Sequence, residues 1–184
     1  MWAPARPGEE CSVQRKTVAF FLVLLCLVVA ACGYRPLGRD MASRFGEGES
    51  ISIPIFVNKT FKSNLENVLL NQLIDEFARR KHLKIGRGDG TDYTLSGEVL
   101  SYTRKEVSYS GADEVTEYRA TMVISATLRK NTTRNVLWKG ELSWSQDYPS
   151  SSDIGLLQNN EEAAIREISQ RLAQQLYLKM SEDF

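Results

Sequence analysis

The sequence predicts an α/β (α+β) two-layer sandwich, in which two helices pack on a mixed four-stranded sheet. Three observations lead to this fold class. Apolar and polar residues alternate in four segments after residue 49, and apolar residues recur at helical spacing in two others. These segments follow one another in the order β-α-β-β-β-α. The first helix would connect parallel strands, so we expect a right-handed crossover.

The first predicted strand is Ser50 to Asn58, with the sequence SISIPIFVN. Every second residue in it is aliphatic: Ile51, Ile53, Ile55 and Val57. This alternation is typical of a half-buried strand. Pro54 has no backbone N–H to donate, so we expect the strand at a sheet edge, or with that position facing outward.

The first predicted helix begins near Ser63. Ser63 and Glu66, three residues apart, form a capping-box signature. The apolar positions that follow have helical spacing: Leu65, Val68, Leu69, Leu73 and Phe77. The helix is expected to end in Arg79-Arg80-Lys81, because cations suit the negative end of the helix dipole.

Three strands and a long helix complete the predicted domain. Turns at Ser110–Asp113 and Asn131–Thr133 separate strands whose apolar positions keep one phase. The phase-setting residues are Tyr93, Leu95 and Val99, then Tyr118, Ala120, Met122, Ile124, Ala126 and Leu128, and finally Val136, Trp138, Leu142 and Trp144. Asn160 is a candidate N-cap for the last helix. Its expected inner face comprises Ala164, Ile165, Ile168, Leu172 and Leu176.

Residues 1–31 have the layout of a lipoprotein signal peptide. Arg15 and Lys16 precede the uncharged run 18–31, which is only about 14 residues long, whereas a helix needs roughly 20 to cross a membrane. The run ends in VAA immediately before Cys32, which resembles the lipobox of bacterial lipoproteins. We therefore expect lipidation of Cys32. The alternative is an ordinary cleaved leader in which this cysteine has no special role.

The cysteines agree with this division of the chain. Cys11 and Cys26 fall in the predicted leader, so the mature chain would have neither a free thiol nor a disulfide. Residues 32–49 contain scattered glycines and no periodicity, which indicates a lipidated N-terminus and a flexible tether. Residues 50–184 are then a single domain, large enough to rely on its own hydrophobic core.

Composition and motifs argue against catalysis and against nucleic-acid binding. The 23 basic and 23 acidic residues give a formal net charge of zero, whereas a nucleic-acid-binding protein needs a basic excess. His82 is the one histidine, and it stands at the basic end of the first helix. Neither a nucleophile motif nor zinc-ligand spacing is present. We expect no enzymatic activity, no cofactor and no bound metal.

A second candidate feature is a basic end of the sandwich. The predicted topology brings the ends of both helices next to the last strand turn, which contains Arg129, Lys130 and Arg134. Cations at helix ends are explained by the helix dipole alone, whereas these three residues are not. They are candidate contacts for phosphates or for an acidic protein surface.

Taken in order, these motifs resemble the LPS-assembly lipoprotein LptE family. The resemblance is carried by CGYRPL at Cys32, by ISIPIFVNKT and by YTLSGEVLSY. It continues through EYRATMVISATL, the strand with Trp138 and Trp144, and EEAAIREISQRLAQQL. It implies an outer-membrane lipoprotein that faces the periplasm and is anchored by acyl chains, such as palmitate, on Cys32. Its implied partner is the LptD β-barrel, which it plugs and helps to assemble.

The resemblance also implies a ligand, because the two proteins together insert lipopolysaccharide into the outer leaflet. The family binds this lipid near the second-to-third-strand hairpin and in the loop after the fourth strand. Here these segments read SYSGADEVTE and DYPSSSDIGLLQNN, which are acidic or neutral. The remaining candidate anion contacts are Arg104, Lys105 and Arg119, beside the hairpin. A lipoprotein adaptor subunit of another envelope complex, such as a lipid transporter, is the alternative function.

Overall fold

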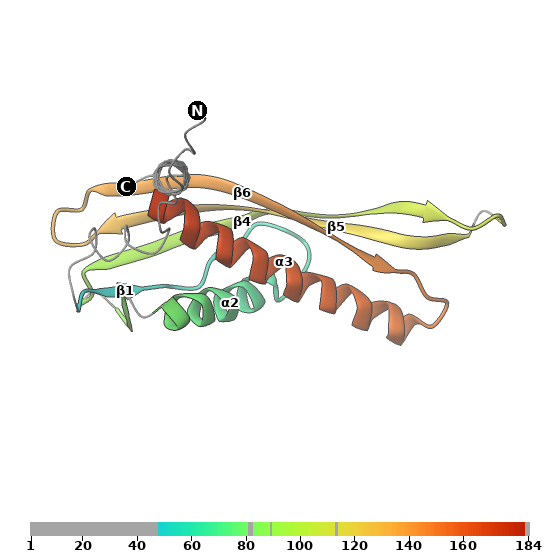
Figure 1. Cartoon of the computed structure of the whole chain (residues 1–184), viewed down its shortest axis with the longest axis horizontal. Helices are drawn as coiled ribbons and strands as arrows, with labels where there is room; N and C mark the ends of the chain where they lie inside the picture. The colour runs from blue at the N-terminus through green and yellow to red at the C-terminus, as the bar shows by residue number, and fades with distance from the viewer. Residues whose placement is uncertain (1–47, 81–82, 89, 113, 183–184) are drawn as a thin grey trace, which may run out of the picture. The chain divides into compact units, whose positions relative to one another are not determined.

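Two helices pack on a mixed sheet in an α+β arrangement, as Figure 1 shows for the computed structural model. The structure describes residues 48–80, 83–88, 90–112 and 114–182. The predicted signal peptide, Cys32 and almost all of the predicted tether lie outside these residues, as do Lys81 and His82. The predicted packing of two helices on a mixed sheet is confirmed.

The strand count and order were predicted wrongly, because the sheet has six strands rather than four. The elements are β1 (Ser50–Ser52), β2 (Val57–Asn58), α2 (Leu65–Arg80), β3 (Lys84–Gly86), β4 (Tyr93–Tyr109), β5 (Val115–Lys130), β6 (Val136–Pro149) and α3 (Ile154–Glu182). The strand order is β3-β1-β4-β5-β6, with β2 also paired to β4. Strand β1 pairs in parallel with β3 and with β4, and β2 pairs in parallel with β4. Strands β4, β5 and β6 form an antiparallel meander.

The predicted first strand is divided into β1 and β2 by one additional residue. Ile51 lies opposite Tyr93 and Val57 opposite Glu98, so six residue steps on one side (57 − 51) face five on the other (98 − 93). The side-chain phase therefore reverses after β1. Phe56 is buried with 2% of its surface exposed, whereas the predicted alternation placed its two neighbours inward, and both are about half exposed.

The Phe56 ring occupies the space that a side chain on Gly97 of β4 would need. A Cβ atom built at residue 97 would overlap the Phe56 ring and the backbone oxygen of Ser125 on β5. This close approach explains why the loop between β1 and β2 turns Phe56 into the core. Gly97 thus determines that the inward-facing positions change after β1, so that Phe56 rather than Ile55 or Val57 is buried.

Strand β3 was missed because it is only three residues long, with Lys84 and Ile85 both exposed. Such a short segment carries no periodic signal. The predicted meander, in contrast, is confirmed: both turns lie where they were expected, between β4 and β5 and between β5 and β6. On β5, alternate residues are buried: Ala120, Met122, Ile124, Ala126 and Leu128.

The helices keep their predicted inner faces but begin differently. The predicted capping box of α2 does not form, because Glu66 accepts a hydrogen bond from the Asn58 side chain at 2.8 Å. Helix α3 begins at Ile154 rather than near Asn160. Its N-cap is Asp153, whose carboxylate accepts a hydrogen bond from the backbone N–H of Leu156 at 3.0 Å.

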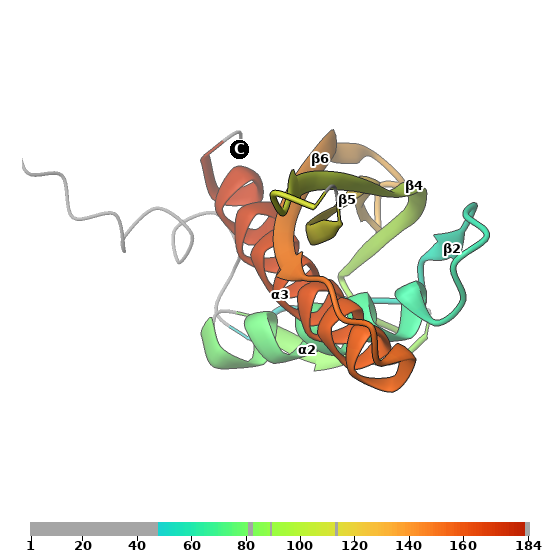
Figure 2. The ribbon, with the colours of Figure 1, turned by 90° about the vertical axis from the view of Figure 1, so that its right-hand side faces the viewer.

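One face of the sheet is covered by the helices, and the core lies between the two layers (Figures 1 and 2). Its largest fully buried side chains are Phe56, Phe77, Ile51, Leu65, Leu69, Leu73, Leu95, Met122, Ile124, Leu128, Ile168 and Leu172. The other face of the meander carries the alternate residues of β4, β5 and β6. Among the described elements, neither helix covers that face, which we call the open face.

We expect Gly97→Ala to lower the free energy of unfolding by about 1 to 3 kcal/mol, the usual range for overpacking a core. The added methyl group would displace the Phe56 ring or separate β4 from β5. Urea unfolding of the variant and the wild type measures this difference. Gly111→Ala is the matched control, because the space around Gly111 is open. Equal midpoints for Gly97→Ala and wild type would contradict this account of the phase change.

Candidate functional site

A buried carboxylate joins three elements near the middle of the domain. Glu161 on α3 has 7% of its surface exposed. Its carboxylate accepts a hydrogen bond from the Tyr102 hydroxyl on β4 at 2.8 Å. Its other oxygen lies 3.0 Å from the Lys62 ammonium group, in the loop before α2, and 3.8 Å from the Arg104 guanidinium group on β4. We call these four residues the Glu161 cluster.

The cluster keeps Glu161 ionised. Burial alone opposes ionisation, but the hydrogen bond from Tyr102 and the nearby Lys62 and Arg104 charges outweigh it and lower the pKa of the carboxyl group. Burial and the bond to Glu161 raise the pKa of the Tyr102 hydroxyl. A neutral phenol, an anion and two cations therefore hold the loop, the sheet and α3 together at neutral pH.

Arg104 also contacts the aromatic side chains beside the cluster. Its guanidinium carbon lies 4.9 Å from the centre of the Tyr118 ring on β5. The Tyr118 ring in turn stacks on Tyr148 of β6, with the ring centres 5.7 Å apart. Arg104, predicted as an anion contact, is therefore engaged within the domain.

Arg119, a second predicted contact, is paired on the open face. Its guanidinium group donates two hydrogen bonds to Asp147 of β6, at 2.6 and 2.7 Å. These bonds lower the pKa of the Asp147 carboxyl group. Lys105, the third candidate beside the hairpin, lies opposite Arg119 in the β4–β5 register, and its side chain is exposed.

The other three candidates lie at the far end of β5. Arg129 is exposed, and Arg134 occupies the turn with φ of 59°. The Lys130 ammonium group lies 5.7 Å from the centre of the Tyr93 ring. Ten residue steps along β5 separate Arg129 from Arg119 (129 − 119), which is roughly 33 Å for an extended strand. The six predicted contacts thus form two separate groups rather than one site.

The basic end predicted from the topology is present but partly neutralised. The last turn of α2 and the β5–β6 turn lie toward the same end of the sheet (Figure 1). Arg79 and Arg80 both contact the buried carboxylate of Glu76, at 3.2 and 2.8 Å. Arg129 and Arg134 are therefore the more available cations at this end of the domain.

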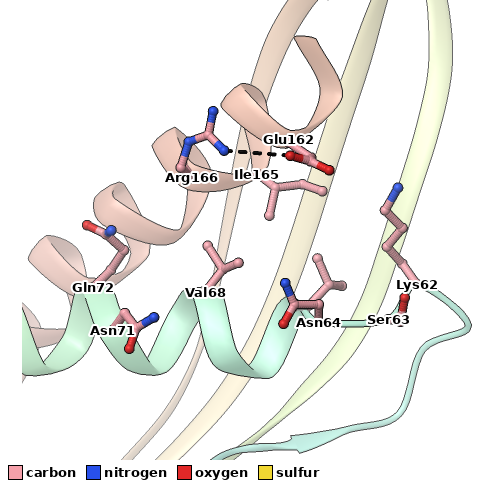
Figure 3. A pocket seen from close by; sticks show the side chains of 10 residues that line it. Lys62, Ser63, Asn64, Val68, Asn71, Gln72, Glu162, Ile165 and Arg166 are labelled. Carbon is pink, nitrogen blue, oxygen red and sulfur yellow. Dashed lines mark ion pairs between the residues drawn. The ribbon is translucent and has the colours of Figure 1, made fainter. Parts of the chain in front are cut away.

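A cleft of about 370 Å³ lies between the start of α2 and the middle of α3. Figure 3 shows Val68 and Ile165 facing each other across it, with Asn71 and Gln72 along one rim. On α3, Arg166 and Glu162 form a long ion pair of 3.9 Å. The cleft can offer amide hydrogen bonds and a small apolar floor, and Lys62 of the Glu161 cluster lies at its edge.

The β4–β5 turn stands beyond the end of β6 and beyond both helices (Figure 1). The last β6 residue in the ladder, Pro149, pairs with Glu117, so the hairpin continues as two strands only. Its final cross-strand pair is Tyr109 with Val115. Of the described tip residues, Ser110 to Ala112 are uncharged and Glu114 is acidic, as the sequence indicated.

The described residues contain no group of three or more His, Cys, Asp or Glu side chains placed to hold a metal ion. Within the same part of the chain, no helix is both long enough and apolar enough to cross a membrane.

Sequence reasoning did not identify the Glu161 cluster as a structural centre. The available signal was the position of Glu161, which stands one helical turn before Ile165 and so lies on the apolar face of the helix. Its partners come from the loop before α2 and from β4, at distant positions in the chain. Only the tertiary structure brings these residues together.

Comparison with known proteins gives one family and a common fold. The model of the family described as "LptE: Lipopolysaccharide-assembly" matches residues 48–180. No curated protein sequence matches the chain. A minor lipoprotein from Acinetobacter baumannii is 17% identical, with a TM-score of 0.50, and the match covers 74% of this chain and 93% of that one.

Two further solved structures are similar. A hypothetical protein from Chlamydia trachomatis is 11% identical with a TM-score of 0.53, and the match covers 74% of this chain and 96% of that chain. The rare lipoprotein B of Shewanella oneidensis is 14% identical with a TM-score of 0.48, covering 71% and 93%. At such identities, the likeness to the first two solved structures shows a shared fold.

We expect Glu161→Gln to destabilise the domain by about 2 kcal/mol at pH 7, between the values typical of exposed and of buried ion pairs. The amide can still accept the Tyr102 hydrogen bond, but it loses the attraction of Lys62 and Arg104. Thermal unfolding measures the effect. Glu162→Gln, at the exposed neighbouring position, is the control and should match the wild type.

The same pair of variants tests the charge of Glu161. Its pKa is lowered in the folded state, so the ionised form stabilises the fold above the ordinary value of 4.5 and loses this contribution as the pH falls below it. The melting-temperature gap between wild type and Glu161→Gln should therefore stay constant from pH 7 to the ordinary value of 4.5 and shrink as the pH is lowered further. A gap that stays constant also below this value would show that Glu161 contributes no charge interaction.

Proposed function

The chain belongs to the LptE family of lipopolysaccharide assembly, and on this premise we propose that it is the lipid-anchored plug of an LptD-type outer-membrane β-barrel. In this proposal it helps the barrel to assemble, and the two proteins together insert lipopolysaccharide into the outer leaflet. The observation that carries the proposal is the family match, which runs from residue 48 to residue 180 and so includes every described strand and nearly all of α3.

The open face supports a position inside a barrel. Its side chains are mostly hydroxylic or charged: Thr94, Ser96 and Glu98 on β4, Thr121, Ser125 and Thr127 on β5, and Lys139, Glu141, Ser143 and Ser145 on β6. The lumen of an outer-membrane barrel is polar. A sheet with this face can contact such a lumen through hydrogen bonds and bridging water.

A plug acts by occupying space, so its shape must be held. The Glu161 cluster fixes the loop before α2 to β4 and α3. The Arg119–Asp147 pair and the Tyr118–Tyr148 stack fix β5 to β6 on opposite faces of the sheet. The proposed role therefore uses these ion pairs as structural ties and needs no catalytic group.

The anchor follows from the N-terminal sequence. We propose that residues 1–31 are removed as a signal peptide and that Cys32 is acylated, including with palmitate. Residues 32–49 are then the tether, which spans up to roughly 60 Å when fully extended, and the domain of residues 50–184 faces the periplasm. Stable anchoring takes more than one acyl chain, which a lipidated N-terminal cysteine supplies.

As direct contacts with lipopolysaccharide we propose the basic side chains that are exposed and not engaged within the domain. Because Arg104 and Arg119 are engaged within the domain, the better candidates are Lys105 beside the hairpin and Arg129 and Arg134 at the basic end. Exposed guanidinium and ammonium groups suit the phosphates of the lipid head group. These three residues are proposed as phosphate contacts. Lys130 is a weaker candidate, because its ammonium group lies over the Tyr93 ring.

Purification of the tagged, lipidated chain from its own membranes in mild detergent tests the barrel partner. We expect one large outer-membrane β-barrel to co-purify in a stable complex, because a plug enclosed by its barrel dissociates slowly. A chain recovered alone, or together with an inner-membrane transporter, would contradict the proposal and favour the adaptor function.

The lipid anchor is tested by metabolic labelling with palmitate. The wild type should incorporate the label and remain with the membrane fraction, whereas Cys32→Ala should lose both, because the thiol is the acylation site. Cys26→Ala, within the segment that is removed, should label normally. Incorporation into Cys32→Ala would place the acylation site elsewhere.

A further inference from the structure

The most exposed large apolar side chain of the described part of the chain lies in the loop between β2 and α2. Phe61 has a relative exposure of 110%, so its whole ring is in water. The next most exposed is Ile154, at 73%. Strand β2 itself pairs with β4, and Figure 2 shows the segment around β2 projecting to one side of the helices. Transfer of this exposed ring from water into an apolar pocket on a partner would be favourable.

The loop is held in place by its own hydrogen bonds. The Asn58 amide donates to the Lys62 backbone oxygen and to the Glu66 carboxylate, both at 2.8 Å. The Asn58 side-chain oxygen accepts hydrogen bonds from the backbone and the hydroxyl of Thr60, at 2.9 and 2.8 Å. Phe61 is therefore presented by a preorganised turn, and little conformational entropy remains to be lost when it binds.

Both ends of the turn are tied to the rest of the domain. The backbone N–H of Lys59 donates to the Val99 oxygen of β4 at 3.0 Å, and Lys62 reaches Glu161 at 3.0 Å. Beside the turn, a groove of about 490 Å³ is lined by Phe61, by the exposed Leu100 and by Tyr102, among others. Phe61 and Leu100 are thus two exposed apolar side chains in a groove that is otherwise lined mainly by polar residues.

The charges around Phe61 favour a protein pocket over a bilayer. Lys59 lies 3.7 Å from Glu98, and Lys62 is paired with Glu161, so the flanking lysines are neutralised within the domain. Attraction to an anionic lipid surface depends on unpaired basic residues. A single acyl chain gives only marginal membrane binding, and one phenyl ring buries less apolar surface than an acyl chain.

We propose that Phe61 is an anchor that inserts into an apolar, uncharged pocket on a protein partner. Aromatic residues that fill such a pocket, surrounded by polar groups that exclude water, dominate many protein interfaces. Lys59, Thr60 and Lys62 supply the polar surround here. The identification of the partner as the barrel rests on the proposed function, whereas the apolar anchor itself rests on the loop.

Two measurements on the full lipidated chain test the proposal: cross-linking in its own membranes and dissociation of the complex purified from them. A photoreactive phenylalanine analogue at position 61 should cross-link to the barrel. Phe61→Ala should speed dissociation of the barrel from the immobilised chain by about 30-fold, the change that corresponds to loss of an interface hot spot. Its melting temperature should match the wild type, because the ring is fully exposed. Ile154→Ala is the control and should leave the dissociation rate unchanged.

The outcomes separate the two proposals. If the barrel co-purifies but Phe61→Ala dissociates at the wild-type rate, the anchor is wrong and the proposed function stands. If the wild type brings down no barrel, the proposed function fails. The anchor then stands only if one other envelope protein both cross-links to position 61 and dissociates about 30-fold faster from Phe61→Ala. Cross-linking to lipid alone, to a second copy of the chain, or to nothing would overturn it.

Discussion

The arrangement of this domain depends on the burial of one carboxylate. Glu161 of α3 is buried, and a buried charge is tolerated only when it is paired and hydrogen-bonded. Lys62 and Arg104 supply the charge, and Tyr102 supplies the hydrogen bond. Because these partners come from the loop before α2 and from β4, satisfying Glu161 also fixes the position of both. The exposed loop and the base of the protruding hairpin are thereby joined to the helix layer.

The long, regular elements could be predicted from the sequence, and the short or irregular ones could not. The meander was predictable because alternation persists over most of β5, from Ala120 to Leu128. The division of the first strand was not, because periodicity cannot reveal an extra residue that is accommodated by Phe56 packing on Gly97. The start of α3 was misplaced because its first turn is largely exposed and so carries no apolar stripe; Asp153, not Asn160, forms the cap.

The candidate site shows the same division between local and tertiary information. Sequence identified six basic residues that could contact phosphate, but it could not show that Arg104 and Arg119 have partners within the domain. Those pairings depend on the β4–β5–β6 register and on the crossing of α3 over the sheet. The family, in contrast, was recognisable from the sequence, because its motifs occur in order along almost the whole domain. The family was therefore predictable from the sequence, whereas the partners of these basic side chains were not.

In the function that we propose, this domain closes a barrel from within, with its polar open face toward a polar wall. Ion conductance in a planar bilayer tests it most directly, because a plugged barrel and an empty one differ in whether ions pass. We expect a large, steady conductance for the barrel partner reconstituted alone and almost none for the barrel with this chain. Equal conductance in the two preparations would show that this chain does not close the barrel.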